Sequence, residues 1–403
     1  MSDKPNIRLF YASCFALITT AFSFSIRAGI LPELGRTFDL TATQLGFINS
    51  MFFFGFPISM VLGGIFYSTL GPKRIMIIAF ITHTIGIVTT IFANGYTGLL
   101  ISTLFIGLGN GCTEAACNPM IATSYSGKQM NTLMNRFHMW FPGGIVLGSL
   151  VSLAMTKMGL GWEAQIWVIM LPTIIYAYLF YGQKFPEAKG EVASLTGNLK
   201  AMATPLFIFI CACMTLTAIS EFGPQQWTGI IMAKSGAEPM VILALVTGLM
   251  AVGRYFGGEF VHRFDQTGVL LGSAIFTAIG IFLFSTQTGP MAYVAAIFFA
   301  MGVCYFWPNM IGFAAEKMPL TGAIGMSIVG AFGMLSTAIF QPIIGGWIDS
   351  DTAKLEATGL TGDALDLAAG QATLQTMITF PAILIVLFAI LLFWMRSRAK
   401  AAH

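Results

Sequence analysis

Charged residues are scarce in this chain of 403 residues, where lysine, arginine, aspartate and glutamate together make up only 9%. The sequence has no run rich in lysine and arginine and no basic patch interleaved with aromatic residues, which excludes a nucleic-acid-binding protein. Hydrophobic residues instead make up 56%, and the mean hydropathy is +0.80. This composition is typical of a membrane protein with many spans.

Cysteine and histidine are also few, with six and four residues respectively. No cysteine forms a C-x-x-C pair or lies near histidines at the spacing of metal ligands, so we predict neither disulfides nor a metal site. No nucleophile and base pair occurs at membrane depth, so we expect no enzyme and no cofactor. The six cysteines are interpreted as small apolar packing residues.

Apolar runs of about 20 to 28 residues recur along the chain, each long enough to cross the ~30 Å hydrocarbon core as a helix. Helices are expected because a backbone in lipid must satisfy its own hydrogen bonds, and the runs lack the alternation of a barrel. We therefore predict an all-α membrane protein with twelve transmembrane helices near residues 8–31, 44–70, 73–93, 97–124, 131–157, 163–182, 204–233, 239–262, 266–286, 290–316, 321–349 and 372–396.

The longest polar break in the middle of the chain separates six spans from six more. We predict an N-terminal six-helix bundle (1–182), a cytoplasmic linker (183–203) and a C-terminal six-helix bundle (204–403). Two pseudo-symmetric six-helix bundles are the layout of the major facilitator type of transporter. In that layout, spans 1, 4, 7 and 10 line a central cavity.

Basic residues are distributed unevenly between the two sides of the predicted spans. If both termini are cytoplasmic, the inner segments hold thirteen lysine and arginine residues and the outer loops hold four. This bias follows the positive-inside rule. We therefore expect a multi-pass protein of the bacterial cytoplasmic (inner) membrane with both termini in the cytoplasm.

Glu114 is the one charged residue in the 53 residues from Ile75 to Gly127. An ionisable group at membrane depth costs at least ~2.5 to 3.5 kcal/mol, so it indicates a cavity, a partner or a proton path. Asn110 and Asn118 lie four residues before and after Glu114, on the same helix face. We expect this face to bind substrate and a coupling ion, a proton rather than sodium.

Polar and aromatic residues also gather in three other predicted spans. Their amides hold hydroxyl groups and their indole rings pack against the C–H face of a sugar, a combination typical of a sugar site. The candidate substrate-binding residues are Glu221, Gln225, Gln226 and Trp227 in span 7, Trp307 and Asn309 in span 10, and Asn135 and His138 in span 5.

Arg27 is a second ionisable residue within an apolar segment, near the outer end of the first span. Three hypotheses remain open for it: a structural cation that extends towards the outer surface, a partner of Glu114 or Glu221, or a fixed charge that receives an anionic substrate. The second hypothesis makes Arg27 part of the proton-coupling machinery. The third makes the protein a transporter or facilitator of organic anions.

Several motifs together resemble the fucose permease-like branch of sugar:proton symporters in the major facilitator superfamily. They are Leu31-Pro32 followed by Phe38-Asp39-Leu40-Thr41, Glu114-Ala-Ala-Cys-Asn118-Pro119, Asn135-Arg-Phe-His138, Glu221 six residues before Trp227, Gly253-Arg254, Trp307-Pro308 and Gly345-Gly346-Trp347-Ile348-Asp349. The resemblance implies alternating-access transport of a monosaccharide. It also implies that Glu114 is a proton-linked carboxyl group, and we expect the transporter to be a monomer.

Overall fold

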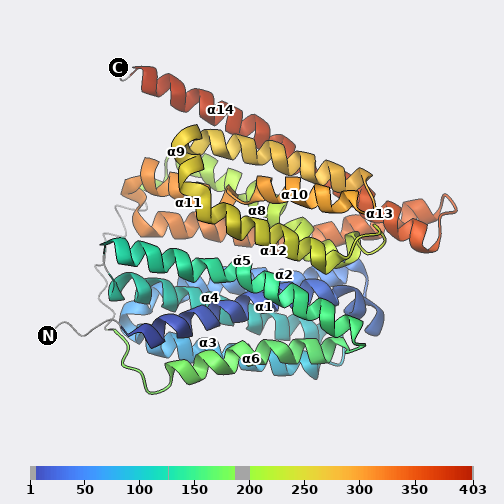
Figure 1. The fold of residues 1–403 in the computed structure, drawn as a ribbon, viewed down its shortest axis with the longest axis horizontal. Coiled ribbons are helices and arrows are strands. Elements are labelled where there is room, and N and C mark those ends of the chain that lie inside the picture. The colour runs from blue at the N-terminus through green and yellow to red at the C-terminus, as the bar shows by residue number, and fades with distance from the viewer. Residues whose placement is uncertain (1–5, 126, 187–199, 402–403) are drawn as a thin grey trace. The chain divides into compact units, whose positions relative to one another are not determined.

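The computed structural model describes residues 6–125, 127–186 and 200–401, with the backbone alone at 127–132, 135, 256–263, 322–323 and 399–401. Nearly all of these residues are helical and none is in a strand (Figure 1). The chain divides into two compact units, Met1–Glu191 (unit 1) and Val192–His403 (unit 2). The linker predicted at 183–203 falls largely on residues 187–199, which lie outside the described residues.

The described part of unit 1 forms six long helices, coloured from blue to green in Figure 1. They are α1 (Ile7–Thr37), α2 (Ala42–Ile65), α3 (Tyr67–Ile91), α4 (Tyr96–Ser124), α5 (Gly127–Lys157) and α6 (Trp162–Phe180). Unit 2 contains α8 (Pro205–Ile231), α9 (Pro239–Thr286), α10 (Met291–Val303), α11 (Phe306–Lys317), the short 3-10 helix η1 (Pro319–Thr321), α12 (Gly322–Glu356), α13 (Gly362–Met377) and α14 (Thr379–Ala401).

Eleven helical stretches of the described residues are long and apolar enough to cross a membrane. A twelfth, Pro239–Tyr255 at the start of α9, is apolar but shorter. Two of the stretches combine consecutive helices, α10 with α11 and α13 with α14. The predicted all-helical fold with twelve spans is therefore confirmed.

Three of the described helices, α1, α2 and α8, begin after a residue whose side chain bonds to a free backbone N–H group of the first turn. The Thr41 hydroxyl accepts from the backbone N–H of Gln44 at 3.2 Å, and the Gln44 side chain accepts from the backbone N–H of Thr41 at 3.0 Å. This reciprocal capping box starts α2. In unit 2 the Thr204 hydroxyl accepts from the N–H of Phe207, and Pro205 occupies the first position of α8, where no donor is lost.

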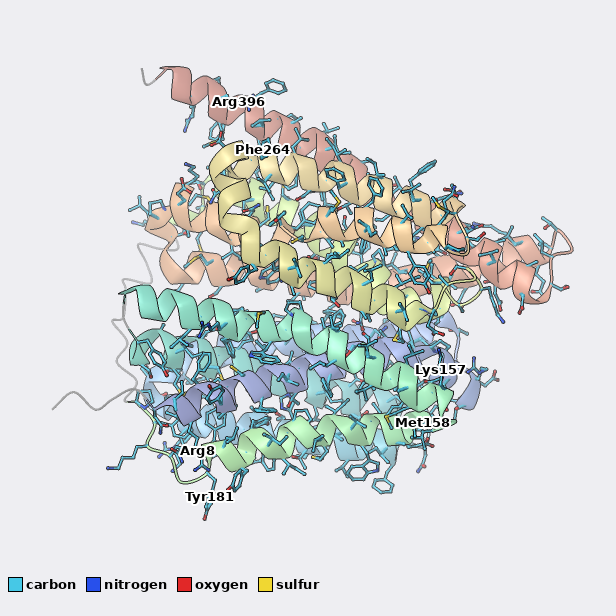
Figure 2. The ribbon with its side chains drawn as sticks, in the orientation of Figure 1. Arg8, Lys157, Met158, Tyr181, Phe264 and Arg396 are labelled. Atoms are coloured by element: carbon cyan, nitrogen blue, oxygen red, sulfur yellow. The ribbon has the colours of Figure 1, made fainter. Side chains whose placement is uncertain are left out.

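Arg8 joins the start of α1 to the end of α6. Its guanidinium donates to the carbonyl oxygens of Leu179 at 3.0 Å and Tyr178 at 2.9 Å, which lie in the last turn of α6. A cation is favourable there because the carbonyl groups at a helix C-terminus carry partial negative charge. Figure 2 shows Arg8 and Tyr181 at one end of unit 1 and Lys157, in the last turn of α5, at the other.

Glycines allow α4 to lie close against α2. A Cβ added at Gly107 or Gly111 would collide with backbone atoms of Phe52 and Phe56 in α2, and one added at Gly55 would lie 2.8 Å from backbone atoms of α4. Larger side chains at these positions would separate the two helices. Gly107 meets Phe52 and Gly111, four residues later, meets Phe56, also four residues later, so α2 and α4 are parallel.

Two kinks occupy matching positions in the two units. Gly71, at the start of α3, has φ 72° and ψ 161°, and Asp265, inside α9, has φ 58° and ψ 154°. Each lies eight residues after the first glycine of a Gly-Gly pair, Gly63-Gly64 in unit 1 and Gly257-Gly258 in unit 2. The same backbone conformation at the same offset relates the two units as repeats.

Candidate functional site

Glu114 lies on α4 and is partly exposed. Its carboxylate Oε2 accepts from Asn118 Nδ2 at 2.6 Å, one helical turn further along. Among the described residues, none of the ion pairs includes Glu114. The amide oxygen of Asn118 is buried and has no hydrogen-bond partner. Glu114 and Asn118 thus form a polar pair whose negative charge no described cation neutralises.

Arg27 lies on α1, with 4% of its surface exposed. Its Nη2 donates to the Asn49 side-chain oxygen of α2 at 2.6 Å, and its guanidinium lies over the Phe52 ring at 4.4 Å. Its other terminal nitrogen, Nη1, has no hydrogen-bond partner. Arg27 is therefore enclosed within unit 1, which disagrees with the hypothesis that it extends towards the outer surface.

The packing of α1 against α4 explains why Arg27 does not meet Glu114. Asn110 Nδ2 on α4 donates to Ser23 Oγ on α1 at 3.3 Å. Helix α1 is antiparallel to α2, because Arg27 contacts Asn49 and Phe24 contacts Phe52. Since α2 is parallel to α4, α1 is antiparallel to α4. Arg27 is four residues beyond Ser23, and Glu114 is four residues beyond Asn110, so the two charged residues lie on opposite sides of this contact. At a rise of 1.5 Å per residue they are about 12 Å apart along the helix axis.

Asn110 belongs to a buried chain of hydrogen bonds that joins four helices of unit 1. His83 Nε2 on α3 lies 2.9 Å from Asn110 Oδ1, and His83 Nδ1 lies 3.0 Å from the Tyr176 hydroxyl on α6. Asn110 Nδ2 donates to Ser23, so its oxygen accepts from His83 Nε2, and Nδ1 is left to accept from Tyr176. In this arrangement both amide atoms of Asn110 have protein partners, which favours a role in holding the helices together.

The span 5 candidates are only partly described. The side chain of Asn135 lies outside the described residues. His138 is exposed, and its ring lies 5.0 Å from that of the buried Phe137. Its proposed contact with substrate stays a prediction.

Glu221 on α8 has a cationic partner in unit 2. Its Oε1 lies 3.7 Å from Arg254 Nη2 on α9, and the Glu221 side chain is 4% exposed. Arg254 Nε also donates to the carbonyl oxygen of Cys304 at 3.0 Å. That oxygen lacks its helical donor because Pro308, four residues later, has no N–H group. Arg254 therefore stabilises both a buried carboxylate and the break between α10 and α11.

The remaining unit 2 candidates are buried amides and indoles. Trp227 is fully buried and its Nε1 has no hydrogen-bond partner, and Asn309 is 5% exposed with an unpartnered Nδ2. Gln225 Nε2 has one weak acceptor, Met250 Sδ at 3.7 Å, and Gln226 is fully buried. Trp307 is half-buried, with its ring 6.2 Å from that of Phe222. Gln225 also borders a small cavity within unit 2 formed by α8, α9, α10 and α13.

Three polar residues of the structure were not among the sequence predictions. Gln341 on α12 is fully buried, and neither of its amide atoms has a partner. It is the one amide side chain in the predicted span 321–349, and this isolation within an apolar run could have identified it as a candidate. Asn49, which holds Arg27, and Tyr176, which bonds to His83, carry no sequence pattern that indicates their contacts.

Comparison with known proteins identifies the family of this chain. Residues 13–340 match the Major Facilitator Superfamily. The hexuronate transporter of Bacillus subtilis (strain 168) is 28% identical over 176 residues, 43% of this chain and 41% of that protein. The L-fucose-proton symporter of Escherichia coli (strain K12) is 28% identical over 124 residues, 30% of this chain and 28% of that protein. Each match spans less than half of the relative's own length.

A solved structure supports the same assignment at the level of the fold. The crystal structure of the D-xylose-proton symporter superposes with a TM-score of 0.75 at 14% sequence identity, covering 92% of this chain and 97% of that chain. The resemblance to the fucose permease-like branch is confirmed for the superfamily alone. This chain belongs to the Major Facilitator Superfamily and is a multi-pass membrane transporter.

Proposed function

We propose that this protein is a secondary transporter that moves a monosaccharide across the cytoplasmic membrane by proton-coupled alternating access. The proposal is carried by one observation, the lack of a cation beside Glu114 among the described residues. Glu221, another acid within an apolar span, is paired with Arg254 at 3.7 Å. The contrast supports Glu221 as a structural group and Glu114 as the group that binds the transported proton.

Protonation gives Glu114 a means to control a conformational change. As a carboxylate it favours a wet environment, and as a neutral acid it tolerates enclosure in an apolar one. A proton that binds one conformation more strongly than the other shifts the population between them. Asn118 supports this role because its amide can donate to the carboxylate, while its free oxygen can accept from the protonated acid.

The proposed substrate is a small polyhydroxylated compound. Trp227, Asn309 and Gln341 carry buried polar atoms without protein partners, and buried groups of this kind are normally paired. Substrate hydroxyl groups supply both donors and acceptors that match them. The names of two of the relatives, a hexuronate transporter and a fucose symporter, support a six-carbon sugar or sugar acid.

A second candidate function, transport of an organic anion, is favoured by Arg27. No described carboxylate pairs with this buried cation, and its Nη1 has no acceptor. The name of the hexuronate transporter describes an anionic substrate. In this alternative Arg27 anchors the substrate carboxylate, since the guanidinium matches carboxylate geometry.

The orientation in the membrane is part of the proposal. Both termini are placed in the cytoplasm because thirteen basic residues then lie in inner segments and four in outer loops. We expect the purified protein to be a monomer.

Uptake into proteoliposomes tests the proposed function. The purified protein is assayed with neutral hexoses, 6-deoxyhexoses and hexuronates, under a proton gradient, a sodium gradient or neither. Glu114→Gln is expected to abolish accumulation driven by the proton gradient and to retain counterflow exchange of the same substrate. Glu163→Gln, an exposed acid at the start of α6, is the control and should behave like the wild type.

Two outcomes decide between the hypotheses. Gradient-driven uptake that survives in Glu114→Gln would show that the assigned proton site is wrong. Arg27→Gln separates the two substrate classes, because the second candidate function requires uptake of hexuronates to collapse while neutral sugars are unaffected. Loss of both classes would instead indicate a structural role for Arg27.

A further inference from the structure

A small cavity lies inside unit 1, away from Glu114. It is bordered by residues of α1, α2, α3, α4 and α6, and its polar border consists of Arg27, Asn49, Thr90 and Thr103. The rest is aliphatic: Ile30, Leu31, Leu34, Ile48, Leu99 and Ile166. The centre of a water-sized sphere can occupy about 10 Å³ of the cavity. That is roughly the room for one water molecule, and a chloride ion is only slightly larger.

The two polar groups that meet at this cavity are both hydrogen-bond donors without acceptors. Asn49 Oδ1 accepts from Arg27 Nη2 at 2.6 Å, which fixes the amide so that Nδ2 is left as a donor. Neither Asn49 Nδ2 nor Arg27 Nη1 has a partner, and each atom is buried. Asn49 is 0% exposed and Arg27 is 4% exposed. The two polar residues that meet at the cavity therefore carry two buried donors that lack an acceptor.

The charge of Arg27 points to the same requirement. An arginine remains protonated in proteins, so this side chain cannot become neutral as a buried lysine can. None of the ion pairs of the described residues includes it. The nearest acid along α1, Glu33, is engaged elsewhere, since its Oε1 accepts from the backbone N–H of Trp162 at 3.3 Å. The Phe52 ring offers only partial compensation.

We propose that this cavity binds a monatomic anion, a halide such as chloride, between Arg27 and Asn49. A halide accepts from both donors and neutralises the guanidinium, whereas a water molecule leaves the charge in place. The aliphatic border and the small volume disfavour a larger oxyanion, which needs further donors. The Thr90 hydroxyl adds little, because its Oγ1 already donates to the carbonyl oxygen of Gly86 at 2.7 Å.

The bound halide is a structural component of unit 1 and is not the transported substrate. It holds α1 to α2 at the depth of Arg27, while Glu114 lies about 12 Å away along the helix axis. Stability should therefore depend on halide even in the absence of substrate. This dependence is separate from the proposed transport function, and either can fail without the other.

Thermal unfolding of the full-length protein in lipid nanodiscs tests the proposal. Sodium chloride or bromide is compared with sodium methanesulfonate, whose anion is too large for the cavity, at equal ionic strength. We expect chloride and bromide to raise the wild-type Tm saturably. Equilibrium binding of radioactive chloride should saturate at one ion per chain, and Arg27→Gln should weaken it by at least about tenfold.

Asn49→Asp is the decisive variant because it supplies the anion from the chain itself. The aspartate has the shape of asparagine and places a carboxylate where Arg27 Nη2 already bonds at 2.6 Å. Its Tm in methanesulfonate should reach that of the wild type in saturating chloride and should no longer respond to halide. This variant keeps the test informative even if Arg27→Gln fails to fold.

Three results would overturn the proposal: a wild-type Tm that does not respond to halide, an equal halide response in Asn49→Asp, or chloride binding that Arg27→Gln leaves unchanged. A fourth is stabilisation through Arg27 by galacturonate but not by chloride. That result would replace the halide site with a substrate carboxylate site and would support organic-anion transport. Failure of the Glu114→Gln uptake test alone would not affect the halide site.

Discussion

Arg27 and Glu114 in unit 1, and Arg254 and Glu221 in unit 2, all lie within apolar spans, and the two units arrange these charges differently. In unit 2, Glu221 and Arg254 lie 3.7 Å apart. In unit 1, Arg27 and Glu114 each bond to an asparagine at 2.6 Å. They lie on opposite sides of the contact between α1 and α4, about one helical turn from it in each direction. Helix register thus decides whether opposite charges neutralise each other or stay available to bind an ion.

The largest effect is expected from removing the carboxylate charge in each unit. Glu114→Gln should lose proton-driven accumulation completely, yet its free energy of unfolding should stay within about 0.5 kcal/mol of the wild type, because no described ion pair depends on it. Glu221→Gln should be less stable but should keep proton coupling. Uptake in proteoliposomes and unfolding by SDS titration in mixed micelles measure the two properties. Loss of coupling in Glu221→Gln would remove the functional distinction between the units.

Removing Arg254, the cation of the ion pair in unit 2, is expected to have the next largest effect. Arg254→Gln leaves the buried Glu221 without a cation and the carbonyl oxygen of Cys304 without its donor. We expect a loss of about 3 kcal/mol, at the low end for a buried pair because the Arg254 side chain is 27% exposed.

The matched control for this prediction is the double variant Glu221→Gln with Arg254→Gln. It should be less destabilised than the sum of the single variants, as expected for two residues in contact. Strict additivity would mean that the two charges do not interact, and the contrast with unit 1 would then not depend on pairing.

The spans could be predicted, and Glu114 could be identified as a candidate, because hydropathy and a lone charge are local properties of the sequence. The pairing of Glu221 with Arg254 could not, because 33 residues separate them and the pattern does not show which helix faces meet. Pairing of Arg27 with Glu114 remained open from the sequence for the same reason. The contact between Ser23 and Asn110 sets the register that keeps them apart.

The helices of unit 1 are joined by a chain of neutral hydrogen bonds, whereas unit 2 has a buried ion pair. Asn110 is the central member of the chain in unit 1. Asn110→Ala leaves buried polar groups of His83 and Ser23 without this partner, and we expect a loss of about 2 kcal/mol in the free energy of unfolding. Asn118→Ala, two turns further along α4 and partly exposed, is the control and should cost less than about 0.5 kcal/mol. Equal losses would argue against a structural role for the chain through His83.

The matching kinks of the two units give the smallest predicted effect. Both positions have a positive φ, with ψ at 161° for Gly71 and 154° for Asp265, a region that favours glycine. Unit 2 nevertheless has an aspartate there. Asp265→Gly should therefore stabilise the protein by about 1 kcal/mol, and Gly71→Ala should destabilise it by a similar amount.

Space around Gly71 allows a clean control. A Cβ at Gly71 meets no atom within 4 Å, and the same holds at Gly64, which lies in helical backbone at the end of α2. Gly64→Ala should be neutral or slightly stabilising, because alanine favours the helix. The two glycine variants thus differ in backbone conformation and not in packing. Equal stability of Gly71→Ala and Gly64→Ala in SDS titration would show that the kink is unstrained, and the expected gain from Asp265→Gly would then have no physical basis.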